Sequence, residues 1–311
     1  MTTTTARHRR RSLVPAVPRG MRLGLNAACA ALLAATALNA TAATTTPPTQ
    51  DAQAMEMARN SAAHLAAKRY AEALADANRA LDLKTDEPAL FMLRAFIEHE
   101  QGNPLPALQD TTEALRLRPD LPEARVFRAR LRSVLGDHSG AADDIARAVP
   151  LIPPEAELRV ELARYYDYYD QPSEAVRQWE LWLSHRPGNA DQRIGLNERC
   201  WLRARRGMEL PLALHDCQRA AALPGSTPAP FDSLGWTQLR IGDLVAAKAA
   251  FDASLGMKAD HVWSLYGRGL TALKAGDAQA AERDLRAARL LKPAIGTEVR
   301  EAGFEVPDGV E

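Results

Sequence analysis

Residues 231–243 read FDSLGWTQLRIGD, and residues 262–277 read VWSLYGRGLTALKAGD. Each stretch has the apolar spacing of a helix and ends in a Gly-Asp pair. The two pairs, Gly242-Asp243 and Gly276-Asp277, lie 34 residues apart. A period of this length is typical of helical hairpins that stack in series.

The 34-residue period extends from Ala54 to Ile295 and is interrupted by one insertion of four residues. Every unit has alanine at its position 20, and most have small residues at positions 8 and 27. The units are 54–87, 88–121, 122–155, 156–189, 194–227, 228–261 and 262–295. The position-20 alanines are Ala73, Ala107, Ala141, Ala175, Ala213, Ala247 and Ala281.

Each unit divides into two helices at a turn near its positions 15 and 16. Glycine accepts the left-handed backbone that ends the first helix, and the following Asn or Asp caps the second. Small residues at positions 8, 20 and 27 let the two helices approach closely. One hairpin cannot bury its apolar face alone, so neighbouring hairpins have to stack.

This pattern resembles the tetratricopeptide repeat (TPR) family, in which positions 8, 20 and 27 are small and position 32 is often proline. The resemblance covers 242 of the 311 residues. It implies an all-α fold, a right-handed superhelical solenoid of about seven 34-residue hairpins with a concave and a convex side. Residues 296–311 are then predicted to form a C-terminal cap that uses Val299 and Phe304.

The N-terminus has the layout of a secretory signal peptide. A basic stretch precedes the apolar run LGLNAACAALLAATALNATAA at 23–43, and small residues offer cleavage after Ala40 or Ala42. We predict a signal peptide over 1–42, a linker over 43–53, and export, in bacteria to the periplasm. An uncleaved inner-membrane anchor is one alternative, and a cytoplasmic protein is another. A true start at Met21 would leave a shorter basic stretch of Arg22 alone.

The formal charge of zero conceals an uneven distribution. Residues 1–42 hold six arginines and no acidic residue, so the rest of the chain has a net charge near −6. An acidic body provides no general electrostatic attraction for nucleic acid, and we expect none as a partner.

The fourth unit is unusually aromatic, with four tyrosines and two tryptophans within 165–182. Trp179 and Trp182 fall on core positions, and Tyr166 is expected to join them. The other tyrosines either cover the junction with the next unit or form a ligand-contacting patch. These are Tyr165, Tyr168 and Tyr169.

The four-residue insertion, a spacer at 190–193, follows this unit directly. It predicts a soft boundary between two sub-arrays, 54–189 and 194–295. A longer turn that continues the array without a break is the alternative.

Cys200 and Cys217 occupy positions 7 and 24 of the same unit, which face each other across a hairpin. They are a possible disulfide in an oxidising compartment. The alternative is a pair of small buried apolar residues, since free cysteine is commonly buried.

The sequence contains no recognisable catalytic or cofactor motif. It lacks HExxH, paired CxxC, GxGxxG, Walker and GxSxG patterns. His215-Asp216-Cys217 is the nearest approach to a catalytic set, but adjacent helical residues point in different directions. We therefore expect no enzyme, no metal site and no cofactor.

The resemblance implies that partners bind on the concave face, at positions 2, 5, 9, 12 and 13 of each first helix. These positions supply a set of aromatic and basic residues, which are common interface anchors. About half of them are expected to seal contacts between units instead. The candidate residues are Phe96, Arg130, Arg164, Tyr168, Arg205, Arg206, Trp236, Arg240, Trp263 and Tyr266.

These features predict a non-enzymatic, exported scaffold or adaptor that binds a protein or peptide partner in the groove. A cytoplasmic or membrane-tethered adaptor with an uncleaved N-terminus is the first alternative. An accessory subunit that binds a ligand through the aromatic unit is the second. The sequence names no partner, because one groove serves unrelated ligands.

Overall fold

The computed structural model describes residues 49–307, 309 and 310, and the predicted targeting segment lies outside them. The chain divides between Leu151 and Ile152 into two compact units, and each is described here by itself. The N-terminal unit contains α2 (Gln50–Ala66), α3 (Tyr70–Leu83), α4 (Pro88–Glu100), α5 (Pro104–Leu117), α6 (Pro122–Val134) and α7 (His138–Ala148), then a short 3₁₀ turn at Val149–Leu151.

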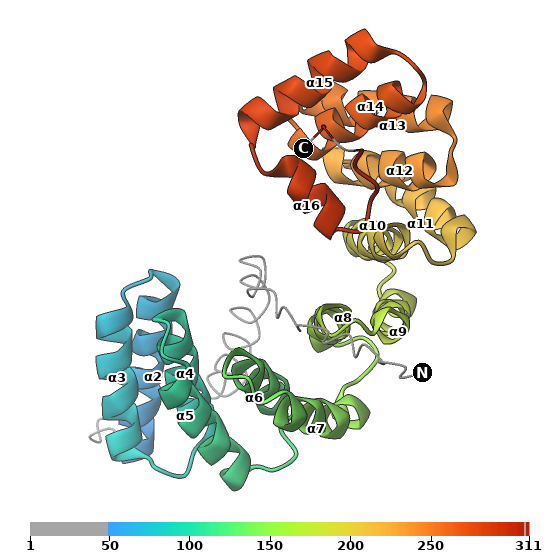
Figure 1. The fold of residues 1–311 in the computed structure, drawn as a ribbon. Helices are drawn as coiled ribbons and strands as arrows, with labels where there is room; N and C mark the ends of the chain where they lie inside the picture. The colour runs from blue at the N-terminus through green and yellow to red at the C-terminus, as the bar shows by residue number, and fades with distance from the viewer. Residues whose placement is uncertain (1–48, 308, 311) are drawn as a thin grey trace, which may run out of the picture. The chain divides into compact units, whose positions relative to one another are not determined.

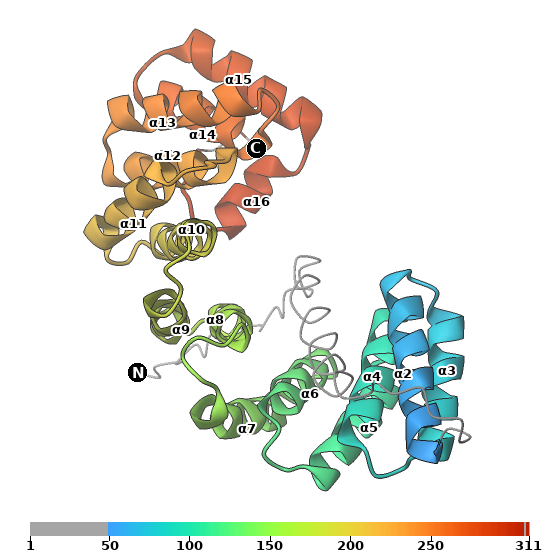
Figure 2. The same cartoon turned by 180° about the vertical axis from the view of Figure 1, so that it is seen from behind.

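The C-terminal unit continues with further helical hairpins and one short closing helix. It contains α8 (Leu158–Tyr168), α9 (Pro172–Ser184), α10 (Asn189–Arg206), α11 (Leu210–Ala222), α12 (Pro228–Ile241), α13 (Leu244–Met257), α14 (Val262–Lys274), α15 (Ala278–Leu291) and α16 (Ile295–Glu301). The two helices of each hairpin lie side by side in both views (Figures 1 and 2). The predicted all-α array of seven hairpins is confirmed for the described residues.

Four of the seven turns between paired helices contain the predicted glycine, and in three of these the following aspartate caps the second helix. Gly242 and Gly276 have φ of 95° and 81°, the left-handed backbone that ends the first helix. The carboxylate of Asp243 accepts a hydrogen bond from the Ala246 N–H at 3.0 Å and so caps α13. Asn103 differs, because its side chain donates to Glu98 at 2.8 Å instead of capping α5.

Small residues set the distance between the helices of a pair. All seven position-20 alanines are buried. At Gly235, an added Cβ would lie 2.6 Å from the Phe251 ring, and at Gly269 it would lie 2.8 Å from Leu285. Packing this close leaves no room for larger side chains at these positions.

A recurring ion pair, which sequence reasoning missed, joins the two helices of four hairpins. In each, an arginine of the first helix donates through two nitrogens to a buried aspartate at position 23 of the unit. The signal was the recurrence of aspartate at this position. The pairs are Arg94–Asp110, Arg128–Asp144, Arg199–Asp216 and Arg268–Asp284.

The spacer at 190–193 lies within α10, near its start, and the division of the chain comes earlier, after Leu151. Four residues add about one turn to a helix, so the insertion lengthens α10 without changing its phase. Gln192 also donates to the Leu183 carbonyl at 2.8 Å, which ties the extra turn to α9. The predicted soft boundary at 190 therefore differs from the division that the structure shows.

The ends of the array also differ in detail from the predicted limits. α2 begins at Gln50, within the predicted linker, and Thr49 caps it by accepting from Ala52 at 3.2 Å. At the other end, α16 buries Val299, and Phe304 beyond it is also buried. None of the helices in the described part of the chain is long and apolar enough to cross a membrane.

Candidate functional site

The predicted concave face of the C-terminal unit comprises the first helices of its last three hairpins, α10, α12 and α14. Its aromatic centre is packed into the core. Trp236 and Tyr266 are completely buried, and the Trp236 ring meets the half-buried Trp263 edge-on at 5.9 Å between centroids. These three predicted groove residues therefore form the floor of the face.

The irregular segment that follows α16 lies on this floor. The described residues 303–307, 309 and 310, hereafter the 303–310 segment, run from the end of α16 across α12 to α14 (Figure 1). Phe304 is its central contact, with its ring centroid 4.5 Å from Trp236 and 5.5 Å from Trp201. Phe304 was predicted only to cap the last hairpin, but its ring also packs against Trp201 and Trp236 on the predicted concave face.

Three polar contacts hold the 303–310 segment beside this aromatic anchor. Arg240 donates to the Gly303 carbonyl, and its guanidinium lies 4.8 Å from the Phe304 ring centroid. Lys274 pairs with Glu305 at 3.4 Å, and the Tyr266 hydroxyl donates to the Val310 carbonyl at 2.7 Å. The face therefore offers one aromatic site, two cations and one hydroxyl donor to a polypeptide.

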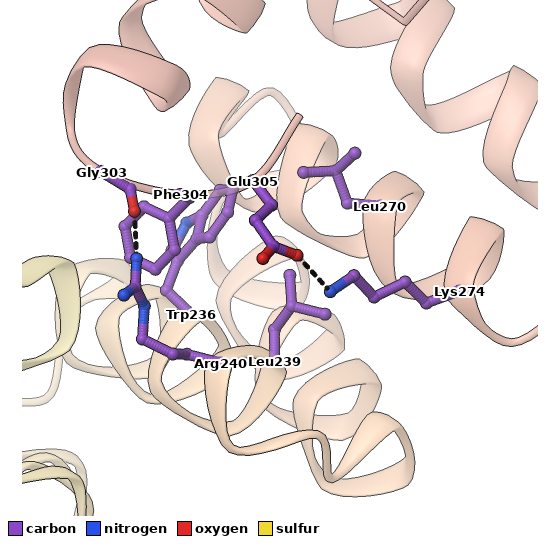
Figure 3. Close-up of a pocket in the computed structure, with 8 residues that line it drawn as sticks. All are labelled: Trp236, Leu239, Arg240, Leu270, Lys274, Gly303, Phe304 and Glu305. Atoms are coloured by element: carbon purple, nitrogen blue, oxygen red, sulfur yellow. Dashed lines mark hydrogen bonds and ion pairs between the residues drawn. The ribbon is translucent and has the colours of Figure 1, made fainter. Parts of the chain in front are cut away.

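A pocket of about 210 Å³ remains between the segment and the helices. Figure 3 shows Arg240 and Lys274 approaching the segment from α12 and α14, with Phe304 over Trp236. Leu239 and Leu270 complete the apolar part of the pocket. The volume is small and the lining is mixed, which suits one or two side chains of a peptide better than a cofactor.

The predicted arginines of α10 pair with Asp167 of α8 and with Asp170 in the turn that follows it. Arg205 and Arg206 both bind the Asp167 carboxylate, and Arg206 also binds Asp170 at 2.5 Å. Burial, followed by the neighbouring charge of Arg206, lowers the pKa of Arg205 to about 10. These side chains therefore tie two hairpins together.

Arg164 and Tyr168, the predicted groove residues of the fourth unit, contact other residues of the same hairpin. Arg164 pairs with Glu161 at 3.0 Å, and the Tyr168 ring meets Tyr169 edge-on at 5.0 Å. Tyr166 is half-buried and packs against the cluster that contains Trp179 and Trp182, as predicted, and Tyr165 is buried as well. Trp179 and Trp182 are buried as predicted.

The two predicted groove residues of the N-terminal unit differ in exposure. Phe96 is buried and packs against Phe127, with ring centroids 4.3 Å apart. Arg130 is half-buried on α6. Phe96 thus seals the contact between two hairpins, which is the role expected of about half of the candidates.

A Ser-His-Asp cluster that sequence reasoning missed lies between α12 and α14. Ser264 donates to Asp232 at 2.6 Å, and its oxygen lies 2.8 Å from His261 Nδ1. Burial raises the pKa of Asp232 to about 7, against the opposing hydrogen bond from Ser264. Burial also lowers the pKa of His261, followed by the charge of Lys258.

This cluster does not have the arrangement of a catalytic triad. Ser264 lies between the carboxylate and the imidazole, whereas a nucleophilic serine contacts the imidazole, which in turn contacts the carboxylate. Ser264 is also completely buried and shares a further hydrogen bond with Ser254 at 2.7 Å. The cluster is therefore a buried polar network that holds α14 against α12 and α13.

Cys200 and Cys217 form a disulfide in the structure, with their Cα atoms 5.4 Å apart. Both are completely buried, and Thr237 of α12 lies 3.3 Å from the Cys200 sulfur. The bond joins α10 to α11. Among the described residues, no group of three or more His, Cys, Asp and Glu side chains is placed to bind a metal ion.

Comparison with known proteins identifies the fold through structure alone. No protein-family profile matches the chain, and no curated protein matches its sequence. A tetratricopeptide repeat protein from Parabacteroides merdae is similar at a TM-score of 0.58 and 16% identity, over 80% of this chain and 97% of that one. The C-terminal part of a TPR repeat-containing protein from Cytophaga hutchinsonii gives 0.58 and 14%, over 79% and 99%.

A third similar structure is the APC/C hetero-tetramer Cut9–Hcn1, at a TM-score of 0.55 and 14% identity. That match covers 90% of this chain and 52% of the matched chain, so this chain spans about half of its length. Identities this low establish the fold and nothing beyond it. The described part of the chain is an all-helical, TPR-like solenoid.

Proposed function

We propose that this TPR-like solenoid is a non-enzymatic scaffold that binds a polypeptide segment of a protein partner on the face of α10, α12 and α14. The observation that carries the proposal is the 303–310 segment, a non-helical stretch of polypeptide that already lies on this face. A surface that seats a peptide through an aromatic floor and flanking cations has the chemistry of a peptide-binding groove.

The architecture of similar proteins supports the same function. One of the similar structures is the APC/C hetero-tetramer Cut9–Hcn1, in which the matched chain is part of a protein complex. Stacked helical repeats create extended concave surfaces, and such surfaces commonly serve protein recognition. The buried, interrupted geometry of the Ser264 cluster also argues against hydrolysis at that site.

We further propose that the protein is exported, in bacteria to the periplasm, after cleavage of the N-terminal segment. The disulfide between Cys200 and Cys217 supports this location, because disulfides persist in oxidising compartments and are rare in the cytosol. N-terminal sequencing of the mature chain tests it. A mature N-terminus at Thr41 or Ala43 is expected, and a chain that retains its first residues would favour the tethered or cytoplasmic adaptor.

Charge reversal on the concave face tests partner binding. Affinity purification of the full chain from its source cell, followed by mass spectrometry, is compared for wild type and for Arg240→Glu combined with Lys274→Glu. Arg240 and Lys274 border the pocket and are partly exposed to solvent, so the variant is expected to fold. Because their charges are reversed, it is expected to lose the partner.

Arg219→Glu is the matched control, because Arg219 is exposed on α11, the second helix of its hairpin. The control should recover the same protein as wild type. If the double variant keeps its helical circular dichroism and recovers that protein equally well, the face is not the binding site.

A further inference from the structure

The 303–310 segment has the contacts of a bound ligand rather than those of one more helix in the stack. Helical structure ends with α16 at Glu301, and Gly303 turns the chain with φ of 95°. Beyond this turn Phe304 enters the aromatic floor, while Glu305 points to the solvent-exposed edge beside Lys274 (Figure 3). The segment therefore uses the same face that the proposed function assigns to a partner.

We propose that residues 303–305 are an internal competitor for a partner peptide that carries an aromatic residue followed by an acidic one. Partner binding then requires displacement of the 303–310 segment from α12 and α14. This inference rests on the proposed function and adds to it the chemistry of the partner and a built-in inhibition.

The aromatic preference follows from the surroundings of Phe304. Its ring stacks on Trp201 at an interplanar angle of 30° and lies against Trp236, with the Arg240 guanidinium over it. Two indoles and a cation around one ring favour another flat aromatic side chain over an aliphatic one. Phe304 is 6% exposed, so the site encloses the whole ring.

The acidic preference follows from the two cations at the edge of the pocket. Lys274 contacts the Glu305 carboxylate at 3.4 Å, and the attraction of Glu305 acts on Arg240 as well. The Glu305 side chain is 87% exposed, so its pairing is screened by salt. An acidic residue in the peptide therefore contributes to specificity, but its ion pair is too weak to provide the binding affinity alone.

Gly303 shows how closely the segment approaches the helices. A Cβ at this position would lie 2.5 Å from the Arg205 carbonyl oxygen, and its φ is one that side-chain-bearing residues rarely adopt. Gly303→Ala should consequently lift the segment from the face while leaving Phe304 in the sequence. It complements Phe304→Ala, which removes the aromatic anchor.

The test uses a fluorescein-labelled peptide, AGFEVPDGVE, which copies residues 302–311. Its binding to the full mature chain is measured by fluorescence anisotropy for wild type, Phe304→Ala, Gly303→Ala and the control Arg219→Glu. A tethered segment has an effective concentration of the order of millimolar and competes strongly. We expect the two segment variants to bind the peptide at least tenfold more tightly than wild type and the control.

Peptide variants test the specificity in the Phe304→Ala chain. Replacing the peptide's phenylalanine with alanine should weaken binding at least tenfold. Replacing its glutamate with lysine should weaken binding about fivefold, less at high salt. Adding Lys274→Glu to the chain should reverse this second preference, so that the lysine peptide binds better than the glutamate peptide.

Circular dichroism and melting curves establish that each variant is folded before binding is compared. Folded Phe304→Ala and Gly303→Ala chains that bind no better than wild type would overturn the internal competition. Equal binding of the phenylalanine and alanine peptides would overturn the aromatic site. A wild-type dimer that becomes monomeric in Phe304→Ala would show that the segment serves a second copy, which also contradicts the proposal.

The outcome is separable from that of the proposed function. If the peptide fails to bind any folded variant while charge reversal at Arg240 and Lys274 still abolishes partner recovery, the internal competitor is refuted and the scaffold function stands. If charge reversal also leaves partner recovery unchanged, both are refuted.

Discussion

Asp144 is a buried position-23 aspartate that faces three arginines, and its replacement by asparagine gives a sharp test of the repeated ion pair. Its carboxylate accepts from Arg128 at 2.9 and 2.7 Å and from Arg132 at 2.8 Å, and Arg125 lies 3.7 Å away. The Asp144 side chain is 2% exposed. Asparagine has nearly the same shape, so Asp144→Asn removes the charge without creating a cavity.

The loss should be large because three cations would then face a neutral amide. Removing one partner of a buried pair typically costs about 3–5 kcal/mol, since the remaining charge has no counterion. Arg128 and Arg125 are only 14% and 13% exposed, so solvent compensates little. The asparagine oxygen still accepts one bond, which places the expected loss near the lower end, about 3 kcal/mol.

Urea unfolding followed by circular dichroism gives the first measurement. Hydrogen exchange of peptides from α6 and α7 gives a local one, which is needed because repeat arrays do not always unfold in one step. Asp143→Asn is the control, because Asp143 is the exposed neighbour on the same helix and should change stability by less than about 0.5 kcal/mol. Equal effects of the two substitutions would refute the ion-pair reasoning.

Three further predictions concern the C-terminal unit. Ala247→Leu should lower stability by about 1–3 kcal/mol in a thermal melt, because the alanine is completely buried at a close helix contact; an unchanged melting temperature would contradict this. The folded-state pKa of Asp232 is about 7, above its ordinary value of 3.8. The protonated Asp232 carboxyl therefore stabilises the fold fully below about pH 4, and this stabilisation, up to about 4 kcal/mol, is lost as pH rises through 7. Asp232→Asn should flatten this dependence in melts between pH 4 and pH 8, and an unchanged slope would argue against a buried, protonated carboxyl. Mass spectrometry of the unreduced mature protein should find Cys200 and Cys217 bonded, and reduction should cost about 3 kcal/mol for a loop with a sequence separation of 17; two free thiols would exclude the bond in the mature protein.

The hairpin array was predictable from the sequence because its determinants are local and repeat. The left-handed glycine, the capping aspartate and the small residues at positions 8 and 20 act within one unit of 34 residues. Asp243, for example, caps a helix through a residue three positions away. Seven copies in phase made the fold class readable without any long-range information.

Pattern alone did not separate a helix extension from a domain boundary. The spacer at 190–193 is one extra turn of α10, whereas the two units part after Leu151. Prolines 153 and 154 follow directly, and proline is unfavourable within a helix. A four-residue insertion preserves helical phase, so its effect depends on whether the added turn finds a packing partner, which here is α9.

Only the tertiary structure showed that the 303–310 segment covers the predicted concave face. Positions within a unit identified Trp236, Tyr266 and Arg240 as facing residues, but they gave no information on what covers them. The covering contacts join residues far apart in the chain, as when Arg240 binds the Gly303 carbonyl across 63 residues. A periodic pattern specifies only neighbours within and between units, so a contact made once, by a segment outside the repeat, becomes visible only when the chain is folded.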